Sequence, residues 1–236
     1  MESYIEKTIK SVINQTYTNW ELLIIDDCST DSTCDIVNKF AKEDSRIKLY
    51  RNKKNLGVAA TRNIGFELAL GSYIALLDSD DIWLEDKLSK QIGIMVLNNI
   101  DISYCSYRII DENGKKKCKD FLVPISTDYD EALYRLVLSC STVVMSRKVI
   151  ENHRFNTNVG LEDFLFWLQL LKENYTMFGI VEILAEYRIR RGARSSNKLK
   201  VILKRFEIYY NYLNLSLFSS CKILVKSIIV GLKKYR

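Results

Sequence analysis

Residues 72–81 read SYIALLDSDD, an apolar run followed by three aspartates within four residues. A continuous apolar run this short is typical of a strand that is buried on both faces, as in a parallel sheet. Residues 21–27, ELLIIDD, repeat the pattern. Two strands that end in acids predict a group of carboxylates at the carboxyl edge of an α/β sheet, which is the edge where ligands bind.

Strand and helix patterns alternate around these two runs. Helical patterns cover residues 5–16, 59–70 and 85–98, a further helix starts at the cap-rich residues 29–33, and another short strand covers 47–51. From about residue 101 the pattern is mixed, with strands expected at 102–110, 142–146 and 177–189, helices at 129–138 and 161–172, and two C-terminal helices. The alternation predicts an α/β fold with a Rossmann-like, mostly parallel sheet that is flanked by helices.

Composition limits the class of protein. The 236 residues are 47% hydrophobic and 27% charged, as in a globular domain, and no apolar run approaches the roughly 18 residues of a membrane-spanning helix. The net charge of +6 is local, because residues 197–236 hold nine basic residues and one acid, and the remainder sums to −2. This distribution argues against nucleic acid as a partner of the main body.

Cysteine and histidine content bears on location and chemistry. Six cysteines without CxxC spacing, behind an N-terminus with no secretory pattern, predict reduced thiols in a cytoplasmic protein. The single histidine, His153, provides no zinc-ligand set and disfavours histidine-based catalysis. Carboxylates are therefore the expected proton carriers.

The acids of residues 78–81 are the strongest candidate site. Asp78, Asp80 and Asp81 follow the predicted strand and can converge on one hard cation. Mg²⁺ or Mn²⁺ held in this way can neutralise a diphosphate leaving group. The alternative is helix capping, for which one acid suffices, so three acids favour a functional site.

Asp27 and Arg62 are the next candidates. Asp27 ends its strand where a carboxylate can accept hydrogen bonds from a nucleobase or a ribose, whereas residues 29–31 fit a helix cap. Arg62 can pair with Asp78 or Asp81, or with a phosphate. A purely structural Arg–Asp pair is nearly as well supported.

Three features of the second half have two interpretations each. Glu162 and Asp163 open a helix, which dipole effects alone explain, and the functional alternative is a general base for a hydroxyl group. The arginines of residues 188–194 can clamp phosphate or form a solvated loop. In the helix expected at 221–235, one side carries Lys222, Lys226 and Lys233 and the other carries Leu224, Ile228 and Leu232. This helix can contact an anionic membrane surface or pack on the body.

Taken in order, three segments resemble the family 2 glycosyltransferases, which are inverting enzymes with a GT-A fold. The segments read WELLIIDDCSTDST (20–33), NLGVAATRNIGFELALGSYIALLDSDDIWLEDKLSKQ (55–91) and GLEDFLFWLQLL (160–171). The basic tail looks like that of members that build bacterial surface polysaccharides. The resemblance implies a GT-A domain at 1–200, with a nucleotide-sugar half at about 1–100 and a mixed acceptor half at about 101–200. Residues 201–236 would form a basic helical appendage.

The resemblance implies a donor-binding role for five of these residues by position. Asp27 would contact the uracil or ribose of a nucleotide-sugar donor, of which a UDP-sugar is the expected kind. Asp78 and Asp80 would form a DxD pair that holds Mn²⁺ or Mg²⁺, with Asp80 as the direct metal ligand. Asp81 would stand next to this pair, and Arg62 would brace the acids or the diphosphate.

The resemblance also implies a base, an acceptor and a location. Asp163 would deprotonate an acceptor hydroxyl, which attacks the anomeric carbon in one inverting displacement. The acceptor would be a sugar or a lipid-linked sugar in bacterial cell-surface polysaccharide synthesis. The expected location is the cytoplasm, with peripheral contact at the inner face of the membrane through the C-terminal helix.

Three departures from the family leave alternatives open. The family's N-terminal strand and its proline-containing turn have no counterpart, which predicts a mis-set start site or a truncated product. The two neighbouring strands would then lack a partner or pair in a rearranged order. Cys28 replaces a usual glycine, and the absence of a QxxRW-like motif argues against a processive synthase. The alternatives are a truncated, non-catalytic relative and a sugar-phosphate nucleotidyltransferase.

Overall fold

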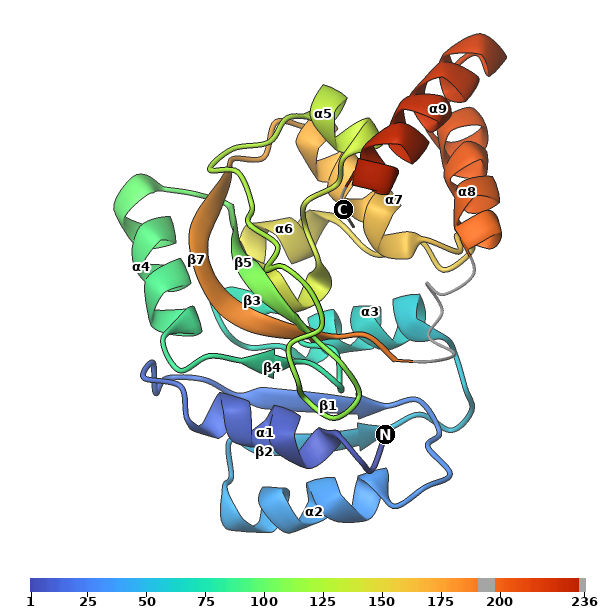
Figure 1. The fold of residues 1–236 in the computed structure, drawn as a ribbon. Coiled ribbons are helices and arrows are strands. Elements are labelled where there is room, and N and C mark those ends of the chain that lie inside the picture. The colour runs from blue at the N-terminus through green and yellow to red at the C-terminus, as the bar shows by residue number, and fades with distance from the viewer. Residues whose placement is uncertain (191–197, 234–236) are drawn as a thin grey trace.

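The computed structural model describes residues 1–190 and 198–233, in which helices flank two β-sheets (Figure 1). The first half contains α1 (Ile5–Ile13), β1 (Leu22–Asp26), α2 (Thr33–Glu43), β2 (Ile47–Arg51), α3 (Val58–Leu68), β3 (Tyr73–Ala75), β4 (Ile82–Trp83) and α4 (Lys87–Asn98). The second half contains β5 (Ile102–Ile110), α5 (Tyr129–Tyr134), β6 (Val144–Ser146), α6 (Arg147–Asn152), α7 (Glu162–Lys172) and β7 (Met177–Arg188). The C-terminal helices are α8 (Lys198–Glu207) and α9 (Leu217–Lys233).

The strands form two separate sheets. β1 and β2 pair in parallel across the connecting helix α2, and a five-stranded sheet has the order β3-β6-β5-β7-β4. Within it β5 and β7 are parallel, whereas the other neighbours are antiparallel. The predicted α/β class is confirmed. The prediction of a mostly parallel sheet is wrong for the larger sheet, which is mixed, because only β5 and β7 are parallel there. Parallel neighbours require long connections, and those between β1 and β2 and between β5 and β7 contain helices.

β1 and β3 are less buried than their apolar sequences predict. Four of the five residues of β1 are only partly buried, and β3 has one buried residue, Ile74. Among the described residues, each of these strands has a paired neighbour on one side only. The other edge of each strand therefore lies outside the ladder of hydrogen bonds. The expectation that both strands are buried on both faces is wrong, although each strand still leads into its aspartates.

Helix α1 holds the loop that connects β3 to β4. Ile5 and Ile9 bury one face of the helix in a small core shared with α2 and β2. On another face the Thr8 hydroxyl donates to the carbonyl oxygens of Asp81 at 2.8 Å and Ser79 at 3.1 Å. The position of the acid loop is thereby coupled to the packing of α1.

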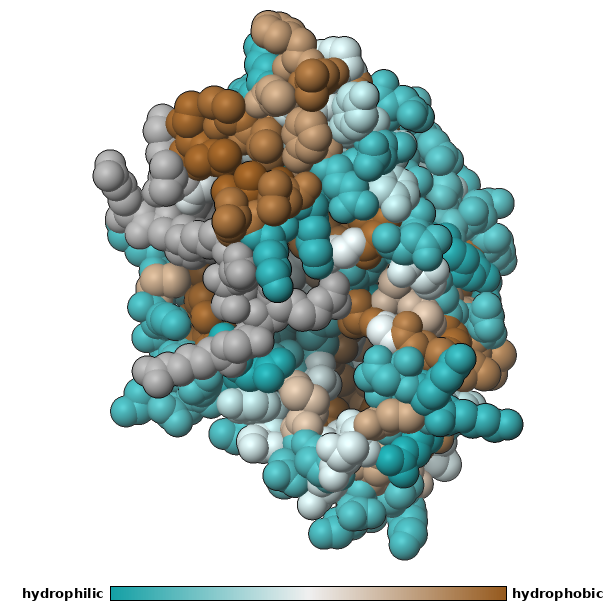
Figure 2. All heavy atoms as spheres, turned by 90° about the vertical axis from the view of Figure 1, so that its right-hand side faces the viewer, coloured by the Kyte–Doolittle hydropathy of each residue, from teal (hydrophilic) through white to brown (hydrophobic). Residues whose placement is uncertain are grey.

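The C-terminal helices lie on the second half of the chain (Figure 1). Tyr209, which follows α8, is fully buried and shares a hydrophobic cluster with Leu165 and Leu168 of α7. The hydroxyl of Tyr209 also donates to the carbonyl oxygen of Leu133 in α5. On the face shown in Figure 2, apolar side chains gather over this upper part of the molecule.

Two further expectations concern reduced cysteines and membrane-spanning helices. All six cysteines are free thiols, as their spacing predicts. Over residues 1–190 and 198–233, no helix is both long enough and apolar enough to span a bilayer.

Candidate active site

The three aspartates that follow β3 go to three different partners. The backbone N–H of Asp78 donates to Ser141 Oγ at 3.0 Å, and its carboxylate accepts from Arg62 Nη2 at 2.8 Å. The Asp78 side chain is 38% exposed, so its carboxylate remains accessible from solvent. Asp78 is thus a surface acid that is held in place by one arginine.

Asp80 is paired with an arginine from the segment that follows β7. Arg190 Nε contacts the Oδ2 atom of Asp80, and Arg188 Nε donates to the Asp80 carbonyl oxygen at 2.8 Å. Of the two interpretations of the arginine segment, a solvated loop does not fit either residue, because Arg188 is buried and Arg190 neutralises Asp80. Arg191 and Arg194 lie outside the described residues.

Asp81 is buried inside the protein and is only 1% exposed. Its carboxylate accepts hydrogen bonds from Ser141 Oγ at 2.5 Å and from the backbone N–H of Arg188 at 2.8 Å. Burial, and next the charge of Asp78, raise the pKa of Asp81 well above the usual range. Asp81 therefore joins β7 to the acid loop, and the donor-binding role that the sequence implies for it stays a prediction.

Arg62 connects the acid loop to helix α7. Its Nη2 atom contacts Asp78, its Nη1 atom donates to Glu162 Oε1 at 3.2 Å, and its guanidinium lies 5.4 Å from the ring centre of Phe155. The bracing position predicted for Arg62 is observed toward Asp78, and Glu162 is a second partner that sequence reasoning missed.

Asp163 lies beside this arginine at the start of α7 and is half-buried. Burial raises the pKa of Asp163, the guanidinium of Arg62 opposes this shift, and the charge of Glu162 adds to it, so that the pKa is raised overall. Asp163 Oδ1 accepts the backbone N–H of Phe164 at 2.8 Å. A fixed carboxylate with a raised pKa has the properties of a general base.

Asp27 organises the loop that precedes α3. Its carboxylate accepts hydrogen bonds from Asn52 Nδ2 at 2.9 Å and from the backbone N–H groups of Leu56 and Gly57, both at 2.8 Å. Burial alone would raise the pKa of Asp27, but these hydrogen bonds outweigh burial and lower it. The carboxylate is therefore ionised and in part occupied by its own loop.

A cavity of about 440 Å³ lies between this loop and α7. It is lined by Asp27, residues 55–59, Thr157, Val159 and Glu162. The cavity thus connects two regions that the sequence singles out, the end of β1 and the start of α7. Its lining combines apolar side chains with the acids Asp27 and Glu162, a mixture that is typical of ligand-binding clefts.

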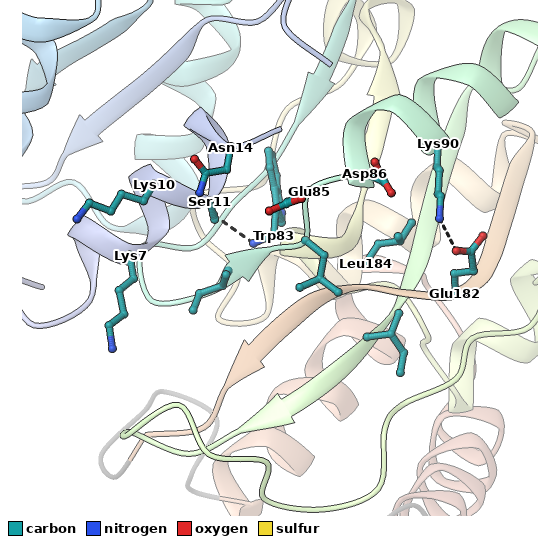
Figure 3. A pocket seen from close by; sticks show the side chains of 13 residues that line it. Lys7, Lys10, Ser11, Asn14, Trp83, Glu85, Asp86, Lys90, Glu182 and Leu184 are labelled. Carbon is teal, nitrogen blue, oxygen red and sulfur yellow. Dashed lines mark hydrogen bonds and ion pairs between the residues drawn. The ribbon is translucent and has the colours of Figure 1, made fainter. Parts of the chain in front are cut away.

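A larger cavity of about 620 Å³ lies elsewhere, between α1, β4, α4 and β7 (Figure 3). None of the predicted site residues lines it. Its charged side chains are in part paired with one another, as Lys90 is with Glu182, and Ser11 Oγ accepts the backbone N–H of Trp83 at 3.2 Å. The smaller cavity is therefore the candidate active site.

A divalent cation is compatible with Asp78 and Asp80. Across the described ranges no three His, Cys, Asp or Glu side chains gather into a metal cluster. Arg62 contacts Oδ1 of Asp78, and Arg190 contacts Oδ2 of Asp80. Among the described residues, the second oxygen of each carboxylate is left for a ligand. Mg²⁺ and Mn²⁺ take hard oxygen ligands, and Mg²⁺ is commonly held by one or two carboxylates together with substrate phosphates, so these residues fit the cation.

The chain is similar to known glycosyltransferases in sequence. It is 39% identical over 206 residues to TuaG of Bacillus subtilis (strain 168), a glycosyltransferase named for teichuronic acid biosynthesis, covering 87% of this chain and 82% of TuaG. It is 37% identical over 238 residues to WfgD of Escherichia coli, covering 99% of this chain and 90% of WfgD. WfgD is named a UDP-Glc:alpha-D-GlcNAc-diphosphoundecaprenol beta-1,3-glucosyltransferase.

Solved structures share the fold at low sequence identity. TarS of S. aureus (residues 1–349, in complex with UDP-GlcNAc) superposes with a TM-score of 0.73 at 20% identity, covering 96% of this chain and 68% of that chain. The mannosyltransferase PcManGT of Pyrobaculum calidifontis, in complex with GDP-Man and Mn²⁺, gives 0.68 at 15% identity, covering 97% and 71%. The family described as Glycosyl transferase family 2 matches residues 2–154. The protein therefore belongs to glycosyl transferase family 2, with a GT-A fold and the activity class of a glycosyltransferase.

Proposed function

We propose that the protein is an inverting glycosyltransferase that moves a sugar from a UDP-sugar to an acceptor hydroxyl in the synthesis of a bacterial cell-surface polysaccharide. The names of the relatives support these substrate classes, since TuaG is named for teichuronic acid and WfgD for a UDP-Glc donor and an undecaprenol-linked acceptor. The related fold of TarS was solved with UDP-GlcNAc. A lipid-linked sugar, or another sugar, is the acceptor that we propose.

One observation carries the proposal. Arg62 joins the acid loop, through Asp78, to the first turn of α7, where Asp163 has a raised pKa beside Glu162. This arrangement combines a positively charged centre with a carboxylate that can take a proton. Sugar transfer from a nucleoside diphosphate needs both, because charge develops on the diphosphate while the acceptor hydroxyl loses its proton.

We assign the proton transfer to Asp163. In this step Asp163 takes the proton of the acceptor hydroxyl while the hydroxyl oxygen forms a bond to the anomeric carbon. The bond from that carbon to the diphosphate oxygen breaks on the opposite side, and UDP leaves with the electron pair. One displacement of this kind inverts the anomeric configuration. A β linkage made from an α-linked UDP-sugar is its expected product.

On the donor side, Asp80 and Asp78 would hold Mn²⁺ or Mg²⁺, which would neutralise charge on the diphosphate when bound. Arg62 keeps Asp78 in position, and its guanidinium remains close enough to the acids to lower their mutual repulsion. Asp27 shapes the loop at residues 55–57 and presents the uracil or ribose side of the cavity.

We also propose the organisation and location expected from the sequence. Residues of about 1–100 form the nucleotide-sugar half, residues of about 101–200 form the acceptor half, and residues 201–236 form the basic appendage. Free cysteines agree with a reducing compartment, and a lipid-linked acceptor requires access to a membrane. We therefore place the protein on the cytoplasmic side, peripheral to the membrane.

Calorimetric titration of UDP, with and without Mn²⁺, tests the donor site. We expect Mn²⁺-dependent UDP binding in the wild type and a loss of about tenfold or more in affinity for Asp80→Ala. Glu85→Ala, which removes an exposed acid from the next loop, is the matched control and should bind as the wild type does. Equal UDP affinity in Asp80→Ala and the wild type contradicts the assignment. The anomeric configuration of the product, read by NMR, tests inversion, and a retained configuration contradicts it.

A further inference from the structure

We infer that the outward faces of α8 and α9 form a docking surface for an anionic lipid bilayer. Large apolar side chains are exposed on both helices. They are Leu199 and Leu203 on α8 and Leu217, Phe218, Val225, Ile228 and Ile229 on α9, named here the apolar face. Apolar side chains gather over these helices in Figure 2. A contiguous exposed apolar patch marks a site that contacts a protein or a membrane.

Helix α9 exposes large apolar side chains and buries serines, which is the reverse of a usual surface helix. At 100° per residue, the five exposed apolar residues of α9 fall within an arc of about 120°. Ser220 and Ser227, on the other side of the helix, are the buried positions, and Phe218 is 80% exposed. The apolar side predicted from the sequence is therefore corrected, because Leu224 is partly buried against the body and only Ile228 of the predicted set belongs to the apolar face. The side chain of Leu232 lies outside the described residues.

Packing on the body is already provided by the opposite side of α9. Arg205 Nη1 of α8 contacts Ser227 Oγ, and Ile223 and Leu224 pack on the cluster that contains Leu165 of α7. The sequence left open whether this helix contacts a membrane or packs on the body, and its two sides allow it to do both. The apolar face is what remains outside after the helix has packed.

Charge identifies the occupant as an anionic bilayer. Residues 197–236 carry a net charge of +8. Lys222 is exposed and lies within about 20° of one edge of the apolar face. Lys226 is exposed as well, about 60° from that edge, with its Nζ atom 3.4 Å from the ring centre of Tyr134. Lysines beside an exposed apolar stripe bind anionic lipid headgroups while the apolar residues enter the interface. A second copy of the chain would bring the same positive charge to the contact and be repelled.

The docking surface is linked to the candidate active site. Lys204 of α8 packs against Gly160, where its Nζ atom donates to the carbonyl oxygen at 3.2 Å, two residues before Glu162. The N-terminal ends of α3 and α7, which line the cavity, lie on the same side of the molecule as α8 (Figure 1). Docking would therefore bring the cavity near the bilayer. This use of the surface rests on the proposed lipid-linked acceptor, whereas binding to lipid requires neither donor nor acceptor.

Vesicle sedimentation of the full chain tests the inference. We expect the wild type to sediment with phosphatidylglycerol vesicles and much less with phosphatidylcholine vesicles. The double variant Phe218→Ser/Ile229→Ser should lower the partition coefficient by about tenfold or more. Lys222→Gln, which removes one positive charge, should lower it by about fivefold, and only for the anionic vesicles. The matched control is Leu97→Ser on α4, which removes an equally exposed leucine (84%) and should sediment as the wild type does.

The outcomes separate this inference from the proposed function. UDP titration and thermal melting of the double variant should match the wild type, which shows that fold and donor site are intact. Wild-type protein that does not bind anionic vesicles overturns the inference, as does a double variant that binds them normally. A dimer that the double variant dissociates, without vesicle binding, would assign the apolar face to a second copy instead. None of these results depends on whether sugar transfer is observed.

Discussion

Arg62 is the common partner of Asp78 and Glu162, and replacing it by alanine removes that partner. The loss in free energy of unfolding follows from how deeply each pair is buried. The side chains of Arg62 and Glu162 are 14% and 5% exposed. Removing one member of a buried ion pair costs roughly 3–5 kcal/mol, because the carboxylate of Glu162 stays buried while it loses the counter-charge of Arg62. Asp78 is more exposed and adds less than about 1 kcal/mol, since water screens its charge. We expect the free energy of unfolding of Arg62→Ala to fall by about 3–4 kcal/mol.

Urea denaturation is the suitable assay, because urea does not screen ion pairs. With a slope of about 3 kcal/mol per molar urea for a chain of this size, the midpoint should move down by about 1 M. Arg62→Lys keeps the charge but not the two-pronged geometry, and we expect about half of this loss.

A double-mutant cycle with Glu162→Gln isolates the pair. We expect a coupling energy of about 1–3 kcal/mol between the two positions, because neutralising Glu162 removes most of what Arg62 compensates. A midpoint shift below about 0.2 M for Arg62→Ala, or additive effects in the double variant, would refute the bridging role of Arg62.

Three further predictions concern the base, the metal pair and the donor loop. Because burial raises the pKa of Asp163 and only its ionised form accepts a proton, kcat/KM should rise with pH, with its acid limb above the value of about 3.9 for an ordinary Asp. Arg62→Ala should move that limb to higher pH, and a shift to lower pH in the pH–rate profile would contradict the assignment. Arg190→Ala removes the counter-charge of Asp80, so the affinity for Mn²⁺ alone, measured by calorimetry, should rise by about two- to fivefold. A fall in UDP affinity with unchanged Mn²⁺ affinity would instead identify Arg190 as a phosphate clamp. Gly57→Ala should destabilise by about 1–3 kcal/mol in thermal melting, because φ is +83° and ψ is 163°, where residues other than glycine are strained. Gly93→Ala is the control, because a Cβ has free space there too but the residue lies within helix α4. Its melting temperature should rise, since alanine favours a helix over glycine. Equal shifts of the melting temperature in the two variants would argue against backbone strain at position 57.

Local patterns predict the longer elements well, because side-chain periodicity records which face of an element is buried. The strand expected at 102–110 is β5, and the helix expected at 161–172 is α7 at Glu162–Lys172. β3 and β6 are shorter than expected, since each keeps only three residues in the ladder. The sequence contains no local signal for pairing between strands, so the mixed order of the larger sheet was not predictable.

The candidate site shows the same division between local and long-range information. The acids at 78–81 and Asp163 are visible as motifs, whereas their partners are distant along the chain. Ser141 lies 60 residues from Asp81, and Arg188 lies 107 residues from it. Two aspartates that look equivalent in sequence thus differ in burial, because the carboxylate of Asp81 meets these partners and the carboxylate of Asp78 stays at the surface. The only sequence signal for a role of Glu162 as a partner of Arg62 was its position beside Asp163.

The most direct test of the proposed chemistry is the transfer rate of Asp163→Asn, measured together with its affinity for UDP. Asparagine keeps the shape of the side chain, but its amide does not take up a proton near neutral pH. We predict that kcat falls by about 10²–10⁴-fold, as for loss of a general base, while the dissociation constant of UDP stays within about twofold of the wild type. A variant that binds UDP normally and transfers sugar within about tenfold of the wild-type rate would contradict the role of Asp163 as the base.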